Sequence, residues 1–317
     1  MRGLWLENRR LTVRGDIPDP MPAEGEALVR VVRAGICSTD EGLLKGLYPF
    51  TGVIGHEFVG VVEAGPDTLR GKRVVGDINA ACGTCPTCRA GRRKHCPNRT
   101  TLGIVARHGA FADYLTLPAE NLFAVPDGVA TDAAVFTEPL AAALEILERV
   151  TVARTDRVLV AGTGKLGQLI CRVMAMTGCA LSILGRSPAK LERLGDLAAE
   201  IVTAETLQPR SYDLAIEATG NPDGLALALN AVRPQGTLVL KSTFPGAVTL
   251  DTTRLVVDEI ALVGSRCGPF DKALALLERH EIDPTGLIDG RYPLERGLAA
   301  FEHGRRAGAL KILYDLS

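Results

Sequence analysis

The pattern of apolar and polar positions changes character near residue 130. Up to that point the chain carries short, valine-rich runs separated by glycine and proline, which is typical of strands in a compact antiparallel barrel or sandwich. The runs that predict strands lie at 27–33, 58–63, 72–75 and 111–117. The next stretch, 131–150, is rich in alanine and leucine and predicts a helix.

Apolar runs and helical patterns alternate from residue 157 to about residue 265. We expect strands at 157–161, 180–184, 213–217, 236–240 and 260–264, with helices near 165–177, 188–198 and 222–232. Strands that alternate with helices are joined by right-handed crossovers and form a doubly wound parallel sheet. A final helix at 270–279 and a strand at 310–313 are expected to return to the first domain.

The pattern therefore predicts a two-domain α/β protein. We expect a β-rich domain made of 1–128 and 267–317, and a doubly wound domain at 129–266. The length of 317 residues agrees with two domains, because single cores stop growing beyond about 250–300 residues.

Charge and composition exclude several classes of partner. The net charge of −1 provides no bulk attraction to nucleic acid or to an anionic membrane. The first residues have no apolar run long enough for a secretory signal, and no apolar stretch reaches the length of a membrane span. We therefore expect a cytoplasmic protein that binds neither nucleic acid nor membranes.

A glycine-rich turn follows the first predicted strand of the doubly wound domain. Gly162, Gly164 and Gly167 have the G-x-G-x-x-G order of a dinucleotide-binding fingerprint, with Lys165 and Leu166 inside it. One glycine makes the turn, the next lets the backbone approach a pyrophosphate, and the third lets the helix pack closely on the strand. Such turns are common, so the fingerprint alone leaves open a turn that binds no ligand.

Four of the eight cysteines crowd into one short segment. They have the spacing C-x2-C-x2-C-x7-C at Cys82, Cys85, Cys88 and Cys96. In a long chain without a secretory signal, this distribution favours reduced thiols and a metal over disulfides. Four protein ligands leave no open position, so the predicted zinc is structural.

A second group of possible ligands is more dispersed. Cys37 lies in Gly35-Ile-Cys-Ser-Thr-Asp40, and His56 and Glu57 lie in Gly55-His-Glu-Phe-Val-Gly60. Cysteine, histidine and glutamate are zinc ligands, and an incomplete set leaves room for water or substrate. By residue type alone, a buried cysteine and a hydrogen-bonded histidine explain the same residues.

The order of these motifs along the chain resembles that of a known protein family. In sequence they are Gly35-x-Cys37-x-Thr39-Asp40, Gly55-His56-Glu57, the four-cysteine loop, Glu138-Pro139 and the glycine fingerprint. Together, from about residue 25 onward, they resemble the zinc-dependent medium-chain dehydrogenase/reductase family, which includes alcohol, polyol and threonine dehydrogenases. The resemblance implies a GroES-like catalytic domain with a structural-zinc lobe at 82–96, a Rossmann domain, and hydride transfer between NAD(P) and an alcohol or carbonyl.

The resemblance also implies roles for single residues. Cys37 and His56 match ligands of a catalytic zinc, and Glu57 matches the carboxylate beside them. Glu138, in a segment similar to the polyol dehydrogenase branch, would take the third position directly or through water. The alternative is that Glu138 has a structural role, since Pro139 suits a first helical turn and an acidic residue there complements the helix dipole.

The implied mechanism has one departure from the family pattern. Zinc would act as a Lewis acid on the substrate oxygen, and Thr39 matches the hydroxyl that hydrogen-bonds this oxygen. Many members have a histidine three residues after that threonine, whereas this chain has Gly42. Our hypothesis is that protons leave through Glu57, Glu138 and water instead.

The end of the second predicted Rossmann strand bears on the choice of cofactor. NAD-binding sites have an acidic residue there that binds the ribose hydroxyls. This chain has Gly185-Arg186-Ser187, in which Arg186 and Ser187 could bind a 2′-phosphate. Lys190 adds positive charge but does not discriminate between the cofactors. We therefore favour NADP over NAD, the alternative being that Arg186 stacks on the adenine while NAD binds.

The leading prediction is a zinc-dependent NAD(P) oxidoreductase that acts on a secondary alcohol, a polyol or the matching carbonyl. The alternatives are a zinc-free enone or quinone reductase on the same fold and a non-catalytic dinucleotide-binding redox sensor. The segment 42–53 is short and apolar, with Tyr48 and Phe50, which favours a substrate with an apolar or ring portion. The run 259–265 predicts an edge strand, and such edges pair across a dimer in this family, so we expect a homodimer or homotetramer.

Overall fold

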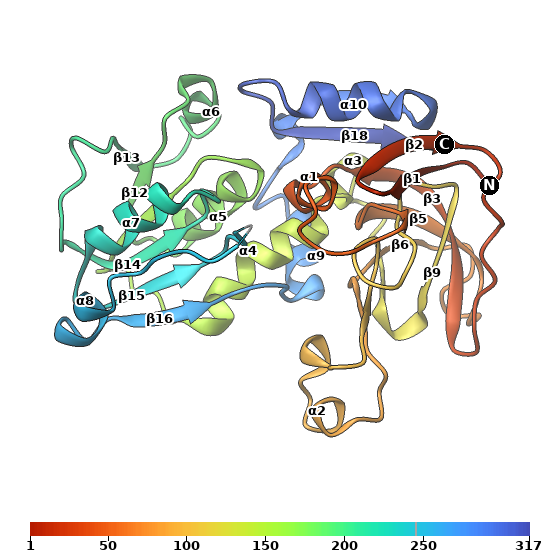
Figure 1. The fold of residues 1–317 in the computed structure, drawn as a ribbon, viewed down its shortest axis with the longest axis horizontal. Coiled ribbons are helices and arrows are strands. Elements are labelled where there is room, and N and C mark those ends of the chain that lie inside the picture. The colour runs from red at the N-terminus through yellow and green to blue at the C-terminus, as the bar shows by residue number, and fades with distance from the viewer. Residues whose placement is uncertain (245) are drawn as a thin grey trace. The chain divides into compact units, whose positions relative to one another are not determined.

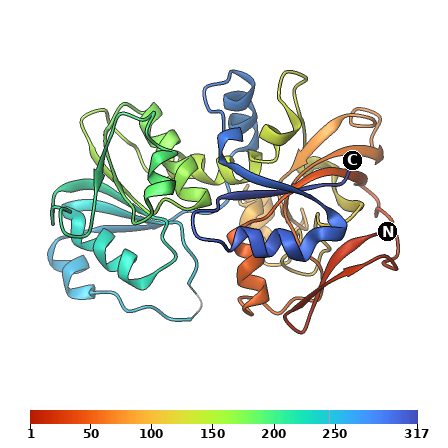
Figure 2. The same cartoon turned by 90° about the horizontal axis from the view of Figure 1, so that it is seen from above.

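The computed structural model describes residues 1–244 and 246–317 and divides into two compact units. The first unit contains Met1–Glu138 and Phe270–Ser317, and the second contains Pro139–Pro269. Both termini lie in the first unit (Figures 1 and 2). The second unit is therefore an insertion into the first.

These units meet at residues other than the expected boundaries after 128 and 266. Residues 131–136 belong to the first unit because Val135 lies against Gly35 and Phe136 lies under Lys311. At the other junction, Gly268 packs so closely on the carbonyl group of Ala141 that no side chain would fit, which keeps it with the second unit.

The first unit is built from antiparallel sheets, with one parallel pair at the edge of the largest. The order of the largest sheet is β10-β6-β5-β3-β18-β17, with β9 paired to β3; the smaller sheets are β2-β1-β4 and β7-β8. The bounds are β1 Gly3–Glu7, β2 Arg10–Arg14, β3 Glu26–Gly35, β4 Gly52–Val53, β5 Glu57–Ala64, β6 Arg73–Gly76, β7 Asn79–Ala80, β8 Thr100–Thr101, β9 Tyr114–Pro118, β10 Leu122–Ala124, β17 Ile288–Pro293 and β18 Lys311–Asp315.

Short helices complete the first unit. They are α1 Ser38–Leu44, α2 Pro86–Arg89, α3 Thr131–Ala134, α9 Phe270–Glu278 and α10 Gly297–Gly304, with short 3-10 turns at Arg93–His95, Ala119–Asn121, Thr285–Leu287 and Leu294–Arg296. The helix α4, Thr137–Arg149, begins in the first unit and continues into the second. The lobe that carries α2 projects away from the sheets of the first unit (Figure 1).

The second unit is a six-stranded, fully parallel sheet with the order β13-β12-β11-β14-β15-β16. Its strands are β11 Arg157–Ala161, β12 Ala180–Leu184, β13 Ala199–Val202, β14 Tyr212–Glu217, β15 Val232–Leu240 and β16 Ala261–Gly264. Its helices are α5 Lys165–Met176, α6 Pro188–Glu192, α7 Pro222–Ala231 and α8 Thr252–Val257. This is the Rossmann strand order, which confirms the predicted fold class, and the order reverses between β11 and β14.

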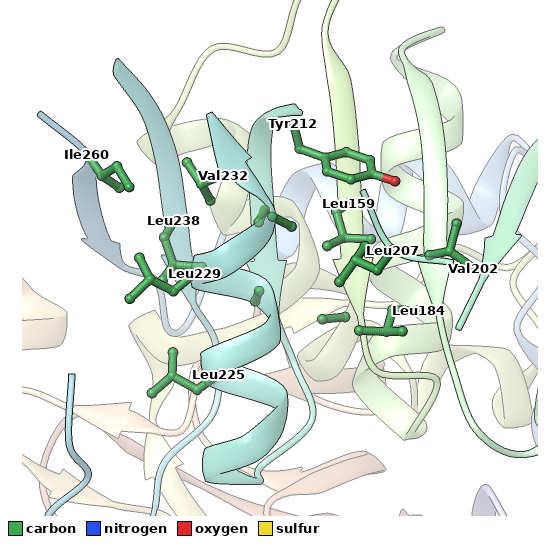
Figure 3. Packing of buried hydrophobic residues seen from close by; sticks show 14 residues of the cluster. Leu159, Leu184, Val202, Leu207, Tyr212, Leu225, Leu229, Val232, Leu238 and Ile260 are labelled. Atoms are coloured by element: carbon green, nitrogen blue, oxygen red, sulfur yellow. The ribbon is translucent and has the colours of Figure 1, made fainter. Parts of the chain in front are cut away.

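The crossovers explain how helices cover this sheet. β12 lies on one side of β11 and β15 on the far side of β14, so right-handed crossovers place α5 and α7 on opposite faces (Figure 2). Under α7, Leu225 and Leu229 join Leu159 and Leu238 of the strands in one buried cluster (Figure 3). The ends of the strands are thereby held in a fixed order along the carboxyl edge.

The structure differs from the predicted elements mainly at sheet edges. The helix expected at 188–198 ends at Glu192, and the chain turns into β13, which the sequence pattern does not reveal. β13 pairs on one side only and is largely exposed, so it lacks the apolar run of a central strand. The β1–β2 hairpin and α8 are likewise present in the structure without having been predicted from the sequence pattern. Among the described residues, no helix is long and apolar enough to cross a membrane.

Candidate functional site

The four-cysteine lobe brings all four predicted thiols together. The Sγ atoms of Cys85 and Cys88 are 3.5 Å apart, those of Cys85 and Cys96 are 3.8 Å apart, and those of Cys96 and Cys82 are 3.5 Å apart. These separations are far too long for disulfide bonds, which measure about 2.05 Å. Pro86 begins α2, and this turn places Cys85 and Cys88 on one side.

The sulfur positions fit a zinc ion. Four sulfurs held about 2.3 Å from a central ion in tetrahedral geometry lie about 3.8 Å apart, close to the observed separations. The backbone N–H groups of Thr84 and Cys85 lower the pKa of Cys82 to about 5, whereas burial raises the pKa of Cys88 to about 12. A cation among the sulfurs would favour the thiolate form of all four.

A second cluster forms where β3 ends and β5 begins. Ligand atoms of Cys37, His56 and Glu57 all lie within 4.8 Å of one another. His56 and Glu57 are buried, and Cys37 is partly exposed. Thr39 lies beside this cluster, with its Oγ1 3.7 Å from Cys37 Sγ. Three of the four predicted catalytic ligands are therefore neighbours.

Asp40 organises two of these ligands, and the sequence analysis assigned it no role. It is fully buried, and its Oδ2 accepts a hydrogen bond of 2.8 Å from the backbone N–H of Cys37, the residue immediately before α1. Its Oδ1 lies 3.3 Å from Nδ1 of His56. A carboxylate beside one ring nitrogen leaves the other available as a ligand, which is the usual arrangement in metal-binding histidines.

Burial alone would lower the pKa of His56, but the negative charges of Asp40 and Cys37 raise it well above its usual value. Glu57 adds a third negative group to the cluster. A site with this surplus of acidic and thiol groups fits a bound cation.

Glu57 is held by a buried ion pair with Lys311 of β18, a residue that sequence reasoning missed. Lys311 is 2% exposed, its ammonium donates to Oε2 of Glu57, and it lies 5.3 Å from the ring centre of Phe136. Burial lowers the pKa of Lys311, but the charges of Glu57, Cys37 and Glu138 outweigh it and raise the pKa. The available signal is a single lysine inside the apolar run Leu310–Tyr314.

Gly35 makes room for this carboxylate. A Cβ atom on Gly35 would lie 2.6 Å from Oε2 of Glu57 and 2.9 Å from Val135. This contact gives a physical reason for the glycine in the motif around Cys37.

Glu138 lies outside the tight cluster of three ligands but within its electrostatic reach. Burial raises the pKa of its carboxyl to about 7; the positive charge of His56 acts in the opposite direction, and the negative charge of Glu57 adds to the increase. Unlike Glu57, which is 1% exposed, Glu138 is only partly buried. The carboxyl itself is desolvated, and its charge interacts with those of His56 and Glu57.

The glycine turn of the second unit has the geometry that its sequence predicts. Gly162 has a φ of +115°, and a Cβ atom there would lie 2.6 Å from the carbonyl oxygen of Ala218. A Cβ atom on Gly167 would overlap the carbonyl oxygen of Gly162, whereas nothing lies within 4 Å of the Cβ position of Gly164. The turn is thus packed on the protein side and open where Lys165 and Leu166 begin α5.

The residues predicted to select the cofactor follow β12. Arg186 is exposed, Ser187 precedes α6 without capping it through its side chain, and Lys190 lies within α6. Gly185 packs against Thr163 of the glycine turn. The two predicted halves of the dinucleotide site are therefore adjacent within one unit.

Comparisons with known proteins agree with this geometry. The model of the alcohol dehydrogenase GroES-like domain matches residues 23–127, and that of the zinc-binding dehydrogenase matches residues 166–279. L-galactonate-5-dehydrogenase of Escherichia coli K12 is 30% identical over 295 residues, which cover 86% of each chain. The chain belongs to the zinc-dependent medium-chain dehydrogenase/reductase family.

Solved structures extend the family likeness to nearly the whole chain. A zinc-binding dehydrogenase of Sinorhizobium meliloti bound to NADP is 27% identical, with a TM-score of 0.90 and coverage of 99% of this chain and 98% of that one. An alcohol dehydrogenase of E. coli CFT073 complexed with NADH is 26% identical, with a TM-score of 0.88 and coverage of 99% of both chains.

This medium-chain dehydrogenase is an oxidoreductase of the alcohol and polyol type that transfers hydride with NAD(P). The comparisons confirm the leading prediction over both alternatives, the zinc-free reductase and the redox sensor.

Proposed function

We propose that the protein binds one structural and one catalytic zinc and uses the second to oxidise a secondary alcohol or to reduce the matching carbonyl. The observation that supports this most is the cluster of Cys37, His56 and Glu57, within 4.8 Å of one another, in a chain that also has a complete four-cysteine cluster. We assign the first unit to the catalytic and structural-zinc functions and the second to the cofactor.

Each residue of the catalytic centre has a proposed task. Cys37 and His56 would hold the zinc, with Glu57 beside them and Glu138 completing the site directly or through water. Zinc bound there supplies a Lewis acid that polarises the substrate oxygen. Thr39 donates or accepts a hydrogen bond at that same oxygen and so fixes its position.

Proton release is assigned to Glu138. Gly42 provides no side chain for a histidine relay, and Lys311 already occupies an oxygen of Glu57. Burial raises the pKa of the Glu138 carboxyl to about 7, so this carboxylate can take a proton near the centre at neutral pH and pass it on toward water. Glu138→Gln should lower kcat strongly; full turnover with full zinc content in this variant would contradict the role.

Metal analysis tests the two-zinc proposal directly. We expect two zinc ions per wild-type chain and one in Cys37→Ala, which retains the four-cysteine cluster. A single zinc in the wild type, unchanged by Cys37→Ala, would rule out the catalytic ion.

We propose NADP as the preferred cofactor, with the dinucleotide over Gly162, Gly164, Lys165, Leu166 and Gly167 and its 2′-phosphate at Arg186, Ser187 and Lys190. The absence of a carboxylate between β12 and α6 supports this, as does the exposed Arg186. Arg186→Ala should lower kcat/KM for NADP by about 10- to 100-fold. Unchanged efficiency with NADP would overturn the assignment.

The proposed substrate is a secondary alcohol with an apolar or ring portion. Tyr48, 41% exposed, and Phe50 lie in the short segment after α1 and support such a portion. A panel of alcohols, polyols and amino alcohols, oxidised with each cofactor, would test this. Preference for a small, fully hydroxylated sugar would contradict it.

We also propose a homodimer or homotetramer in the cytoplasm. The edge strand β16 pairs with β15, and nearby Val256 and Val257 of α8 are 76% and 73% exposed. Such an edge and apolar surface suit a second copy of the chain. All eight cysteines are free thiols, as expected for a reducing compartment. Light scattering that gives a monomer would contradict the assembly.

A further inference from the structure

One buried side chain of the second unit joins the two segments that carry the predicted cofactor residues. Gln168, early in α5, is fully buried. Its Nε2 donates a hydrogen bond of 3.3 Å to the carbonyl oxygen of Thr163 and one of 2.7 Å to that of Lys190. Thr163 belongs to the glycine turn and Lys190 to α6, so this amide spans both segments.

Arg172, one helical turn further along α5, extends the same connection. It donates to Oε1 of Gln168 at 3.1 Å and to the carbonyl oxygen of Arg193, just after α6, at 2.7 Å. Both N–H groups of the Gln168 amide and its oxygen are therefore used, and the partners determine which way the amide faces. Glutamine fits here because it provides two donors and one acceptor.

The helix α6 depends on these bonds for its position. It has only five residues, Pro188–Glu192, and none of them is fully buried. A helix of one turn is not stable alone, so contacts with the rest of the unit must hold it in place. Gly185, just before it, already lies against Thr163, since a Cβ atom there would be 2.7 Å from Cγ2 of Thr163.

We propose that Gln168 is a positioning residue for cofactor selection. It holds Arg186, Ser187 and Lys190 at a fixed distance from the glycine turn, so that one ligand can place its 2′-phosphate and its pyrophosphate correctly at the same time. This inference rests on the proposed preference for NADP. A leucine at position 168 would fill similar space but would remove this donor from the carbonyl groups of Thr163 and Lys190.

The test is equilibrium binding of two adenosine fragments to the full chain, without turnover. Calorimetry with 2′,5′-ADP and 5′-AMP separates recognition of the 2′-phosphate from recognition of the rest. We expect Gln168→Leu to weaken 2′,5′-ADP by about tenfold and 5′-AMP by less than about threefold. Amide hydrogen exchange in 186–193 should become faster in the same variant.

The matched control is Cys171→Ala, a buried position on the same helix that makes none of these bonds. It should change neither the ratio of the two dissociation constants nor the exchange of 186–193. Loss of both ligands to the same extent in Gln168→Leu would overturn the proposal, because Gln168 would then support only the fold. An unchanged ratio together with unchanged exchange would overturn it as well.

If the preference for NADP is wrong, the binding measurements on the wild-type chain will show it separately from the role of Gln168. A wild-type chain that binds 2′,5′-ADP no better than 5′-AMP would contradict the preference for NADP. The positioning role would then be judged by exchange alone: faster exchange of 186–193 in Gln168→Leu supports it, and unchanged exchange overturns it.

Discussion

The two candidate metal clusters of the first unit are built in opposite ways. The four-cysteine cluster comes from one short segment, whose most distant paired ligands are 14 residues apart. The cluster of Cys37, His56 and Glu57 depends on a partner strand, since Glu57 and Lys311 are 254 residues apart. The first can form wherever its loop can close, whereas the second requires the folded sheet.

The difference extends to charge. In the lobe, four sulfur atoms lie close together, and a metal among them would balance their negative charge. In the second cluster, Asp40 and Lys311 already hold His56 and Glu57 in place. We therefore expect the lobe to depend on a bound metal for its structure, whereas the folded sheet holds the residues of the second cluster in place before any metal binds. The following experiments test this contrast.

The largest expected effect is in Cys96→Ala. Cys96 is fully buried, and the binding of structural zinc contributes roughly 10–16 kcal/mol in small peptides. We expect one zinc fewer per chain and new tryptic cleavage within 89–99, a segment rich in arginine and lysine. Cys37→Ala should also lose one zinc but resist trypsin like the wild type. Equal protease sensitivity of the two variants would remove the contrast.

Lys311→Met should have the next largest effect. It leaves Glu57 buried without its partner, which costs about 3–5 kcal/mol of unfolding free energy. The double variant Glu57→Gln/Lys311→Met should recover much of this, because neither position then carries an unpaired buried charge. Urea unfolding with a chelator present measures both. A double variant as unstable as the single one would show that the charge balance is not what stabilises the centre.

Asp40→Asn should act on metal affinity rather than on the fold. It keeps the shape of the side chain but removes the negative charge beside Nδ1 of His56. Loss of such a partner lowers metal affinity by about 10- to 100-fold. Chelator competition should show one weakened zinc and one unchanged zinc. Glu41→Gln, on the same helix α1 and paired with Arg305, is the control and should weaken neither.

The smallest effect concerns the attachment of the lobe. Arg107 binds Glu26 of β3 at 2.7 Å, Thr100 of β8 at 2.9 Å and the carbonyl oxygen of Thr116 at 3.0 Å. Burial raises the pKa of Glu26, but Arg107 outweighs it, so the pKa is lower than usual. Because the folded pKa lies below the unfolded one, this stabilisation is present at neutral pH and is lost as the pH falls through the folded pKa.

Glu26→Gln should therefore cost about 1 kcal/mol at pH 7. Its difference from the wild type in thermal unfolding should vanish in acid, below the folded pKa of Glu26. A difference that stays constant with pH would mean that the pair contributes through packing and not through charge.

The sequence predicts the structure where the interacting residues are close together in the chain or where an apolar run forms a central strand of a sheet. The strands β11 and β12 have the bounds expected from their apolar runs, and the spacing of Cys82 to Cys96 predicted a cluster that the structure forms. The edge strand β13 was missed because exposure on one side removes the apolar signal.

Long-range partners could not be predicted in the same way. Nothing near Glu57 in the sequence indicates Lys311, because their pairing depends on β3 joining β5 to β18 in one sheet. Gln168 is hidden for a related reason: its acceptor on α6 is known only once β12 lies beside β11. Residues that position other side chains through long-range contacts are therefore harder to predict from sequence than residues that bind a ligand.

The ion pair between Glu57 and Lys311 has a consequence for the order of events during synthesis. Because the two partners are 254 positions apart in the sequence, translation at about 5–20 residues per second makes them roughly 13–50 s apart. The inserted Rossmann unit is made in that interval and can fold first. The four-cysteine lobe can take up its metal early on the ribosome, while the centre of Cys37 and His56 is completed only after the last strand of its sheet has emerged.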